Sequence, residues 1–402
     1  MVSVAEAEKI ILSETKDYGN ELIHFESALG RILAEDITAD RDLPPCNRVT
    51  MDGIAISYAA FEKGTRSFKI TGTIAAGDIP IEINGQDECV EIMTGGALPD
   101  SADTVVRYED VVIKNGIAAI ITADIKKGQN IHRKGRDKKQ HDIVAAAGQI
   151  IDPALISMAA SVGKDMLLVQ CLPKVVIITT GDELVDVGEQ PNPYQVRSSN
   201  NYTVKAVLQQ NALPADMLHI PDDLETTRVK IKDCLSQYDV IIMSGGVSMG
   251  KFDYVPQVLE ELGVTKLFHK VQQRPGKPFW FGKDKNGVLV FAFPGNPVST
   301  FLCLHRYFVL WLLFKSKVKS ENQKVYAVLN EDVAFPAPLQ YFMQVKVRVS
   351  EHGQLLATPM EGNGSGDFAN LLGSDAFMEL PMEMSNFKKG EVYRIWPFKQ
   401  II

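Results

Sequence analysis

The residues best suited to chemistry lie in the loop SGGVSMGKFDY, residues 244–254. An apolar run, DVIIM, precedes this loop, and a helical pattern, VPQVLEELG, follows it. Glycines let backbone N–H groups approach an anion closely, and the carboxylate of Asp253 comes near the end of the loop. The pattern predicts a loop that binds an anion together with a metal ion, through Ser244, Gly245, Gly246, Ser248 and Asp253.

Two other loops add carboxylates. In TTGDEL a turn at Gly181 precedes Glu183, and in IPDDLE two aspartates, Asp222 and Asp223, follow a strand pattern. Carboxylates from separate loops above one sheet edge suit Mg²⁺, which takes one or two carboxylates together with phosphate oxygens and water. The alternative is that some of these acids cap helices, and we favour that interpretation for Asp223. Our hypothesis is a Mg²⁺ site made by Glu183, Asp222 and Asp253.

Basic and glycine-containing loops could hold the anion itself. FPGNPVS opens directly into a helix pattern, which leaves spare N–H donors near Pro294, Gly295 and Asn296. QQRPGKPFWFG carries Arg274 and Lys277, and Lys270 lies four residues before Arg274. The alternatives are a rigid turn with a helix cap and a solvated basic loop. The chain contains neither a P-loop pattern nor a dinucleotide-binding glycine pattern.

The elements that must position these loops alternate between strand and helix across residues 171–318. Near-continuous apolar strands between helices predict an α/β domain with a mostly parallel sheet, in which ligands bind at the carboxyl ends of the strands. We expect strands at 174–181, 215–221, 239–246, 264–271 and 287–295, and helices from 200, over 224–238, near 255–262 and from 297.

The flanking regions have different patterns. Helices are predicted over 3–16, with a Ser3–Glu6 capping box, over 25–35, and over 152–163 after an Asp152-Pro153 start. Short β-branched runs, including a hairpin at Asn115-Gly116, predict β structure from about 45 to 130, and β patterns return after 320. The predicted domains are a discontinuous helical domain (1–42 and 138–168), an inserted small β domain (43–137), the α/β domain (169–318) and a C-terminal β domain (319–402).

Composition narrows the class of protein. A chain of 402 residues with a net charge of −8 is expected to form two to four domains, and it lacks the basic excess of a general nucleic-acid binder. Its five cysteines are scattered, which favours a reduced, cytoplasmic setting over disulfides or zinc. The most apolar stretch, FLCLHRYFVLWLLF, is shorter than a membrane span and is expected to be a buried helix.

The motifs TGDEL, GGVSMGKFDY, RPGKP and FPGNPVS occur together, in this order, in the molybdopterin molybdenumtransferase family, which includes bacterial MoeA and the gephyrin E domain. Upstream, VTMDGIAI, IMTGGALPDSADTVV and HRKGRD also resemble stretches of this family. The resemblance implies an elongated four-domain homodimer with a MogA-like α/β domain and a C-terminal β-barrel-like domain. It implies an enzyme of molybdenum cofactor biosynthesis that inserts molybdate into adenylylated molybdopterin, with Mg²⁺-dependent release of AMP. It further implies contact with other proteins of molybdenum cofactor biosynthesis.

Individual positions can be matched to this family. Glu183, Asp222 and Asp253 match acidic positions, and Lys270, Arg274 and Lys277 match basic positions that face anions. A substrate-facing role in the cleft, which a partner subunit completes, is implied for four residues of the first two domains: Asp52, Thr94, Arg133 and Asp137.

The chain also departs from the family pattern. Arg274 replaces a frequent lysine, Arg197-Ser198 stands where Tyr-Asp is common, Cys46-Asn47-Arg48 is unusual, and MDGIA lacks the usual tyrosine. Two alternative functions remain: a MogA-like molybdopterin adenylyltransferase and a non-catalytic, gephyrin-like scaffold.

Overall fold

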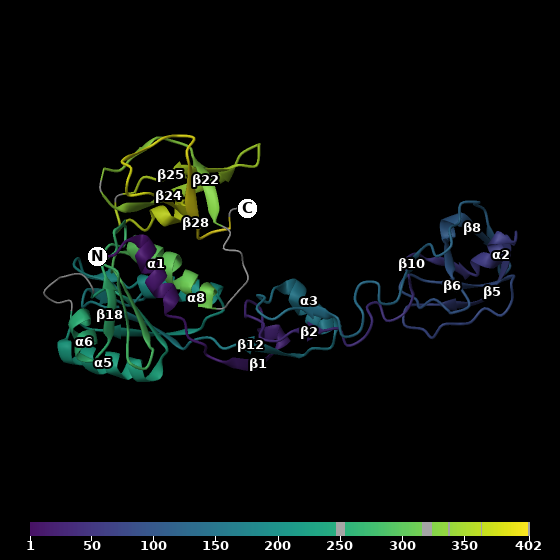
Figure 1. The fold of residues 1–402 in the computed structure, drawn as a ribbon, viewed down its shortest axis with the longest axis horizontal. Helices are drawn as coiled ribbons and strands as arrows, with labels where there is room; N and C mark the ends of the chain where they lie inside the picture. Colours follow the sequence, from purple (N-terminus) through teal and green to yellow (C-terminus); the bar gives the residue numbers. More distant parts are fainter. Residues whose placement is uncertain (247–253, 316–323, 337, 363, 401–402) are drawn as a thin grey trace.

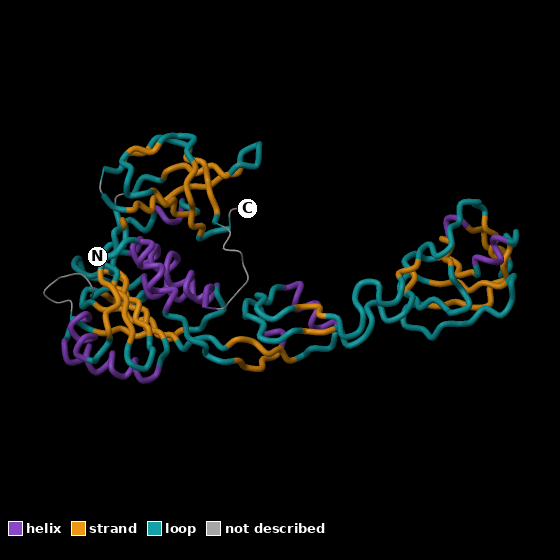
Figure 2. Tube along the Cα trace, in the orientation of Figure 1, coloured by secondary structure: helices purple, strands orange, loops and turns teal. Residues whose placement is uncertain are grey.

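The computed structural model describes residues 1–246, 254–315, 324–336, 338–362 and 364–400. Figures 1 and 2 show an elongated molecule in which an α/β unit and a small barrel lie together at one end. A narrow arm runs from the α/β unit to a separate β lobe at the other end. No helix in the described ranges has the length and apolar character needed to cross a membrane.

The α/β unit is built on a six-stranded sheet with the order β16-β13-β17-β21-β20-β18. The first four strands are parallel, as predicted, whereas β20 runs antiparallel to both of its neighbours and was missed from the sequence. Every residue of β13, β17 and β21 is buried, because apolar layers cover both faces of the sheet. The strands are Ala215–Ile220 (β16), Val175–Thr180 (β13), Val240–Ser244 (β17), Leu289–Phe293 (β21), Trp280–Lys283 (β20) and Thr265–His269 (β18).

Helices form the two covering layers. One layer packs α4 and the continuous helical segment α7-η3-α8 against alternate strand residues such as Val175 and Ile177. The other layer packs α5 and α6 against Val176 and Ile178. The helices are Asn200–Gln210 (α4), Leu224–Gln237 (α5), Val255–Glu261 (α6), Pro297–Cys303 (α7), Leu304–Val309 (η3, a π-helix) and Leu310–Lys315 (α8).

The first helix, α1 (Val4–Ser13), begins with the predicted Ser3–Glu6 capping box but packs in an unexpected place. We expected it to pack with the helix at 152–163. Instead its buried face, Val4, Ala7 and Ile11, joins the core of the α/β unit, as Figure 1 also shows. Periodicity identifies the buried face of a helix but not the element that covers it.

The arm contains two short antiparallel pairs and one helix. β1 (Asn20–His24) pairs with β12 (Met166–Gln170), β2 (Ile37–Thr38) pairs with β11 (Ile143–Ala145), and α3 (Pro153–Ser161) starts at its predicted Asp152 cap.

The predicted helix over 25–35 is wrong. Only the 3-10 turn η1 (Phe25–Ser27) forms there, Gly30 has a left-handed φ of 78°, and Ile32 and Leu33 make β-bridges to Ile150 and Val169. The predicted helical domain is therefore largely strands and loops. The boundaries of the four domains stay predictions.

The outer lobe is a second six-stranded sheet, with the order β7-β4-β6-β5-β9-β8. Its β8–β9 hairpin turns at Asn115 and Gly116, both with positive φ, which confirms the predicted turn. The strands are Thr104–Arg107 (β7), Gly53–Ile56 (β4), Glu88–Ile92 (β6), Ser67–Ile74 (β5), Ile117–Ile120 (β9) and Val111–Lys114 (β8), with the small elements α2 (Tyr58–Glu62), η2 (Tyr108–Asp110), β3 (Arg48–Val49) and β10 (Ile131–His132).

The C-terminal region closes into a five-stranded barrel, because β24 pairs with both β25 and β26 around the ring β24-β25-β22-β28-β26. A strand from the α/β unit, β19 (Gln273–Arg274), adds to β24 from outside the ring. The barrel strands are Val325–Leu329 (β22), Gln340–Val349 (β24), Leu355–Pro359 (β25), Ala376–Leu380 (β26) and Val392–Pro397 (β28), with the short elements β23 (Val333–Ala334), β27 (Asn386–Phe387) and α9 (Asn370–Gly373).

Candidate functional site

A cavity of about 660 Å³ lies at the carboxyl ends of β13, β17 and β21. The loops after these strands line it through Glu183, Ser244, Gly245, Gly295 and Asn296, all of which were predicted from the sequence. Parallel strands bring their carboxyl ends to one edge, so loops far apart in the chain converge there.

Glycines at this edge permit close packing of the loops. Gly181 has a φ of 132°, and a Cβ there would lie 2.4 Å from a carboxylate oxygen of Glu183. Gly245 and Gly246 also have positive φ, and a Cβ on Gly246 would lie 2.8 Å from the Thr180 hydroxyl. Any side chain at Gly181 or Gly246 would therefore force its neighbour to move.

A polar network behind the cavity ties these loops together, and sequence reasoning missed it. The Asn200 side chain donates to Ser244 Oγ at 2.8 Å and to the Gly295 carbonyl at 2.7 Å. Thr300 Oγ1 lies 3.2 Å from Ser244 Oγ and donates to the Pro294 carbonyl at 2.6 Å. Asn200 begins α4, and no local pattern distinguishes it from an ordinary first-turn residue.

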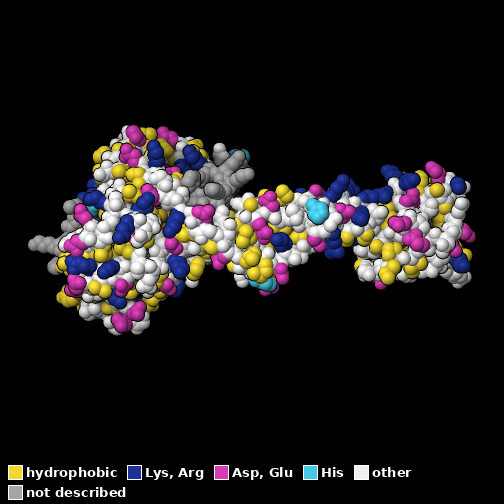
Figure 3. Space-filling model, turned by 60° about the horizontal axis from the view of Figure 1, so that its bottom comes forward, with side chains coloured by type: hydrophobic (Ala, Val, Ile, Leu, Met, Phe, Trp, Pro, Cys, Tyr) yellow, Lys and Arg dark blue, Asp and Glu magenta, His cyan; other side chains and the backbone are white. Residues whose placement is uncertain are grey.

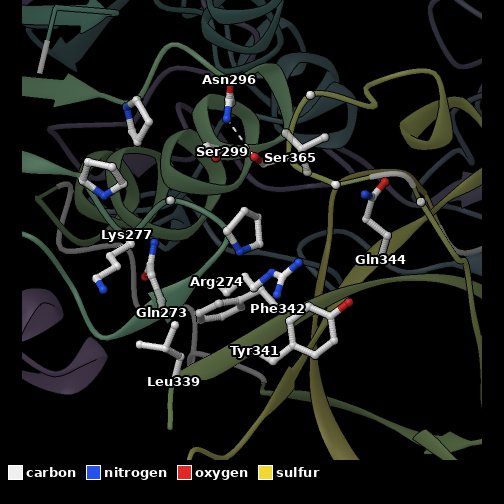
Figure 4. Close-up of a pocket in the computed structure, with 18 of the residues that line it drawn as sticks. Gln273, Arg274, Lys277, Asn296, Ser299, Leu339, Tyr341, Phe342, Gln344 and Ser365 are labelled. Atoms are coloured by element: carbon white, nitrogen blue, oxygen red, sulfur yellow. Dashed lines mark hydrogen bonds between the residues drawn. The ribbon is translucent and has the colours of Figure 1, made fainter. Parts of the chain in front are cut away.

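A second cavity, of about 600 Å³, lies between the RPGKP loop and the barrel (Figure 4). Arg274, Lys277 and Pro294 line it from the α/β unit, while Tyr341, Gln344 and Ser365 line it from the barrel region. Asn296 and Gly366 line both cavities. The Asn296 side chain donates to Ser365 Oγ at 2.8 Å, and Val298 N donates to the Ser365 carbonyl at 3.1 Å, so hydrogen bonds join the two units at this point.

The side chains of Arg274 and Lys277 are exposed, whereas Gln273 and Gly276 of the same loop are buried. Gln273 is fully buried and accepts a hydrogen bond from the Tyr307 hydroxyl. Gly276 has a φ of 85°, and a Cβ there would lie 2.6 Å from the Gln273 side chain. The backbone is therefore fixed while Arg274 and Lys277 present their charges to solvent and the cavity.

Lys270, unlike these two cations, is not part of the wall of the second cavity. It lines neither cavity, and its backbone bonds to Val2 and Phe279 with a left-handed φ of 72°. Its predicted part in the site stays a prediction.

The predicted acidic residues separate into different environments. Glu183 lines the first cavity, whereas Asp222 does not, and its backbone N–H donates to the Asp182 carboxylate at 3.0 Å. Asp223 caps α5 by accepting from Thr226 N at 2.7 Å, which confirms the interpretation favoured for it. Asp253 and Ser248 lie outside the described residues.

No three histidine, cysteine, aspartate or glutamate side chains in the described ranges gather closely enough to hold a metal ion. The acids described at this edge still have the hard oxygen donors that Mg²⁺ prefers, and one or two protein carboxylates suffice when a phosphate supplies the rest. The donor chemistry fits Mg²⁺, although the described residues alone do not form a complete metal site.

The four predicted residues of the first two domains lie on loops where the arm meets the outer lobe. Asp52 Oδ1 accepts from Thr94 N at 2.6 Å and from Thr94 Oγ1 at 2.7 Å. His132 Nε2 lies 2.8 Å from Asp137 Oδ1, and the intervening Arg133 is exposed. The loops are joined to each other, because β3 pairs with β10 and Gly95 N donates to the Val49 carbonyl.

Exposed basic side chains surround this outer group, which also contains one acid with a lowered pKa. Figure 3 shows Lys and Arg side chains gathered where the arm meets the lobe, and the exposed cations of the loop include Arg133, Lys134 and Arg136. The hydrogen bonds from the Thr94 backbone and hydroxyl lower the pKa of Asp52, which keeps its carboxylate ionised. Figure 1 shows the outer lobe at the opposite end of the arm from the α/β unit and the barrel, whose residues line both cavities.

Three family models cover most of the chain. The MoeA N-terminal region (domain I and II) matches residues 2–163, a probable molybdopterin binding domain matches 176–312, and the MoeA C-terminal region (domain IV) matches 326–398. A curated relative from Synechocystis, named molybdopterin molybdenumtransferase, is 37% identical over 98% of this chain and 99% of its own length. The chain belongs to the MoeA family.

Other MoeA relatives agree with this assignment. A Bacillus subtilis protein, also named molybdopterin molybdenumtransferase, is 30% identical over 98% of this chain and 93% of its own length. The crystal structure of a molybdopterin biosynthesis MoeA protein from Pyrococcus horikoshii is 29% identical, covers 99% of each chain and superposes with a TM-score of 0.81. The similarity therefore extends over the α/β unit, the arm, the outer lobe and the barrel.

Proposed function

We propose that the chain is a molybdopterin molybdenumtransferase that inserts molybdate into adenylylated molybdopterin and releases AMP. The observation that carries this proposal is the arrangement of two adjoining cavities around Asn296, one lined by glycine loops and one by Arg274 and Lys277. Both substrates are anions, and an acidic protein binds anions through local basic side chains and backbone donors. Full-length relatives that carry this name support the same conclusion.

The two cavities are suited to different parts of the reaction. The first cavity has backbone room at Gly245 and Gly295 for the pterin nucleotide, beside the carboxylate of Glu183. The second cavity has exposed guanidinium and ammonium groups, from Arg274 and Lys277, for a tetrahedral oxyanion.

We infer that Mg²⁺ is held by Glu183 and Asp222, with Asp253 from the adjoining loop as the third predicted ligand. When bound, Mg²⁺ supplies positive charge that stabilises the phosphate oxygens of the departing AMP. The Glu183 carboxylate lies against Gly181, which places this proposed ligand beside the glycine loops of the first cavity.

The outer-lobe group completes the proposal. Asp52, Thr94, Arg133 and Asp137 belong to the junction of the arm with the outer lobe, and the arm separates this junction from the α/β unit and barrel of the same chain (Figure 1). We therefore propose a homodimer in which the outer lobe of one copy covers the cavities of the other. A self-complementary interface of this kind produces two equivalent sites.

The test is AMP release from adenylylated molybdopterin by the wild type, by Glu183→Gln and by a control, Glu225→Gln. Glu225 lies on the exposed surface of α5, where it pairs with Arg228. We expect Glu183→Gln to slow AMP release at least about tenfold and to require more Mg²⁺, because one anionic ligand is lost. The control should match the wild type, and equal rates for all three proteins would contradict the assigned role of Glu183.

The alternative adenylyltransferase function predicts ATP consumption with molybdopterin alone, without molybdate. The α/β unit is the part that favours it, since a probable molybdopterin binding domain matches residues 176–312. The barrel region argues against this alternative, because it supplies Tyr341, Gln344 and Ser365 to the wall of the second cavity.

A further inference from the structure

The loop that carries Arg274 is attached to the barrel as an added strand. β19 pairs in parallel with β24, which places Arg274 opposite Tyr341, and Gln340 N donates to the Gln272 carbonyl at 3.0 Å. The barrel therefore determines where the backbone of Arg274 lies.

Two stacked rings of the barrel region lie beside this guanidinium. The Phe335 and Tyr341 rings stack with centroids 4.3 Å apart and planes at 18°. Arg274 Cζ lies 5.6 Å from the centroid of Phe335, within the range of a cation–π contact. Phe335 is only 7% exposed, and its backbone N–H donates to the Ser385 carbonyl, so the ring is firmly held.

The charge of Arg274 also acts on Tyr341, the residue it pairs with across the two strands. Burial raises the pKa of the Tyr341 hydroxyl, and the positive charge of Arg274 opposes that rise. Tyr341 and Arg274 both line the second cavity, as Figure 4 shows, whereas Phe335 does not line it. Any effect of Phe335 on a ligand must therefore pass through its neighbours.

We propose that Phe335 is a positioning residue that orients Arg274 toward a tetrahedral oxyanion in the second cavity. A guanidinium held against a ring face loses rotational freedom before the ligand arrives, and it can then offer two parallel N–H donors. A lysine at this position would present a single point charge, so the aromatic contact gives most benefit to the arginine of this chain. The inference rests on the proposed function and extends it to a residue that touches no substrate.

The experiment measures the KM for molybdate and kcat in molybdate-dependent AMP release by the full-length protein. Phe335→Leu should raise the KM for molybdate about two- to fivefold, the size of an exposed cation–π contact, and leave kcat and the KM for adenylylated molybdopterin near wild type. Phe335→Tyr keeps the ring and should restore the wild-type KM.

The matched control is Phe387→Leu. Phe387 is fully buried in the same barrel core as Phe335. Its ring packs against Tyr393, with the ring centroids 5.7 Å apart, and not against Arg274. A general loss of barrel packing would change both leucine variants alike. An equal KM for molybdate in the two variants would overturn the proposal.

A double-mutant cycle separates positioning from packing. Arg274→Lys alone should raise the KM for molybdate about tenfold, and Phe335→Leu should add less to Arg274→Lys than to the wild type. The same factor in both backgrounds would also overturn the proposal. Phe335→Met, which fills more of the ring's volume, replaces Phe335→Leu in the cycle if the leucine variant does not fold.

The outcomes distinguish this inference from the proposed function. Absence of molybdate-dependent AMP release in the wild type would contradict the proposed function itself. Release by the wild type, with Phe335→Leu and Phe387→Leu indistinguishable, would remove only the role of Phe335.

Discussion

Asp222 and Asp223 follow β16 side by side, yet their environments differ. Asp223 accepts from Thr226 N and caps α5, and hydrogen bonds from the Thr226 side chain and backbone lower the pKa of its carboxyl. Asp222 is joined to the neighbouring loop through its backbone bond to Asp182. Adjacent identical residues therefore have separate expected roles, one in stability and one in the site.

Asp223→Ala removes the cap of α5 and should lower the thermal midpoint by a few degrees at most, with AMP release unchanged. Asp222→Asn should show the opposite pattern: slower AMP release with an unchanged midpoint. Thermal unfolding and AMP release measured on both variants test these separate roles. AMP release by Asp222→Asn at the wild-type rate would contradict the role of Asp222 in the site.

The Asp52–Thr94 contact gives a prediction about pH. Thr94→Val removes the hydroxyl donor but keeps the backbone donor, so the depressed pKa of Asp52 should rise part of the way toward its ordinary value. Because a depressed carboxyl pKa contributes stability that is lost as pH falls through it, the variant should lose this contribution at a higher pH than the wild type. A carboxyl NMR titration of Asp52 checks the shift, and an unchanged pKa would exclude the hydroxyl as its cause.

Residue types alone predicted many side chains of the site and missed those that act through tertiary contact. Glu183, Arg274 and Asn296 stand in recognisable glycine and proline loops, and all three line cavities. Asn200 was missed, because its partners Ser244 and Gly295 are distant in sequence and meet it only across the sheet edge.

At the scale of elements, the loop between β19 and β20 depends on glycine at one position for two reasons. The backbone at Gly276 is left-handed, a conformation that strains any residue with a side chain. A Cβ there would also lie 2.6 Å from Gln273 and 2.7 Å from Cys303. Gly287, in the turn before β21, has nearly the same φ, 87°, with nothing within 4 Å. The two glycines form a matched pair in which only the packing differs.

Both Gly276→Ala and Gly287→Ala should cost about 1 kcal/mol from the backbone conformation. Gly276→Ala should cost roughly a further 1–3 kcal/mol from overpacking, and it should also raise the KM for molybdate because Arg274 and Lys277 flank the loop. Denaturant unfolding of the two variants provides the comparison. Equal destabilisation would mean that Gln273 and Cys303 move aside freely.

The strand and helix pattern of the α/β unit was predictable because its strands are buried on both faces and its helices carry clear start signals. β20 was missed because WFGK is short and contains Gly282, whose hypothetical Cβ would lie 2.4 Å from the Trp280 ring. The contribution of the barrel to the second cavity was also missed. No local pattern indicates that Tyr341 pairs with Arg274.

At the scale of the whole molecule, the arm separates two groups of residues that the sequence assigned to one site. The Asp52 group lies where the arm meets the outer lobe, and the α/β unit and barrel that line the cavities lie at the opposite end of the arm (Figure 1). The family resemblance implied an elongated molecule and a cleft that a partner subunit completes. Residue patterns alone did not give the length and direction of the arm, because these depend on short pairings such as β1–β12.

If two copies share each site, two inactive variants should restore activity when mixed. Asp52→Asn damages only the outer lobe and Arg274→Ala damages only the cavity side. Random exchange of subunits makes half of the dimers mixed, each with one intact site, and should give about a quarter of the wild-type rate. AMP release after refolding the variants together measures this, and activity no higher than that of the separate variants would contradict a shared site.

The most direct measurement for the central claim is AMP release from adenylylated molybdopterin by the full-length protein, with Mg²⁺ present and molybdate either added or omitted. The account predicts AMP release that requires molybdate and saturates with it, with a higher KM for molybdate in Arg274→Lys. AMP release at the same rate without molybdate, or no release in its presence, would contradict it.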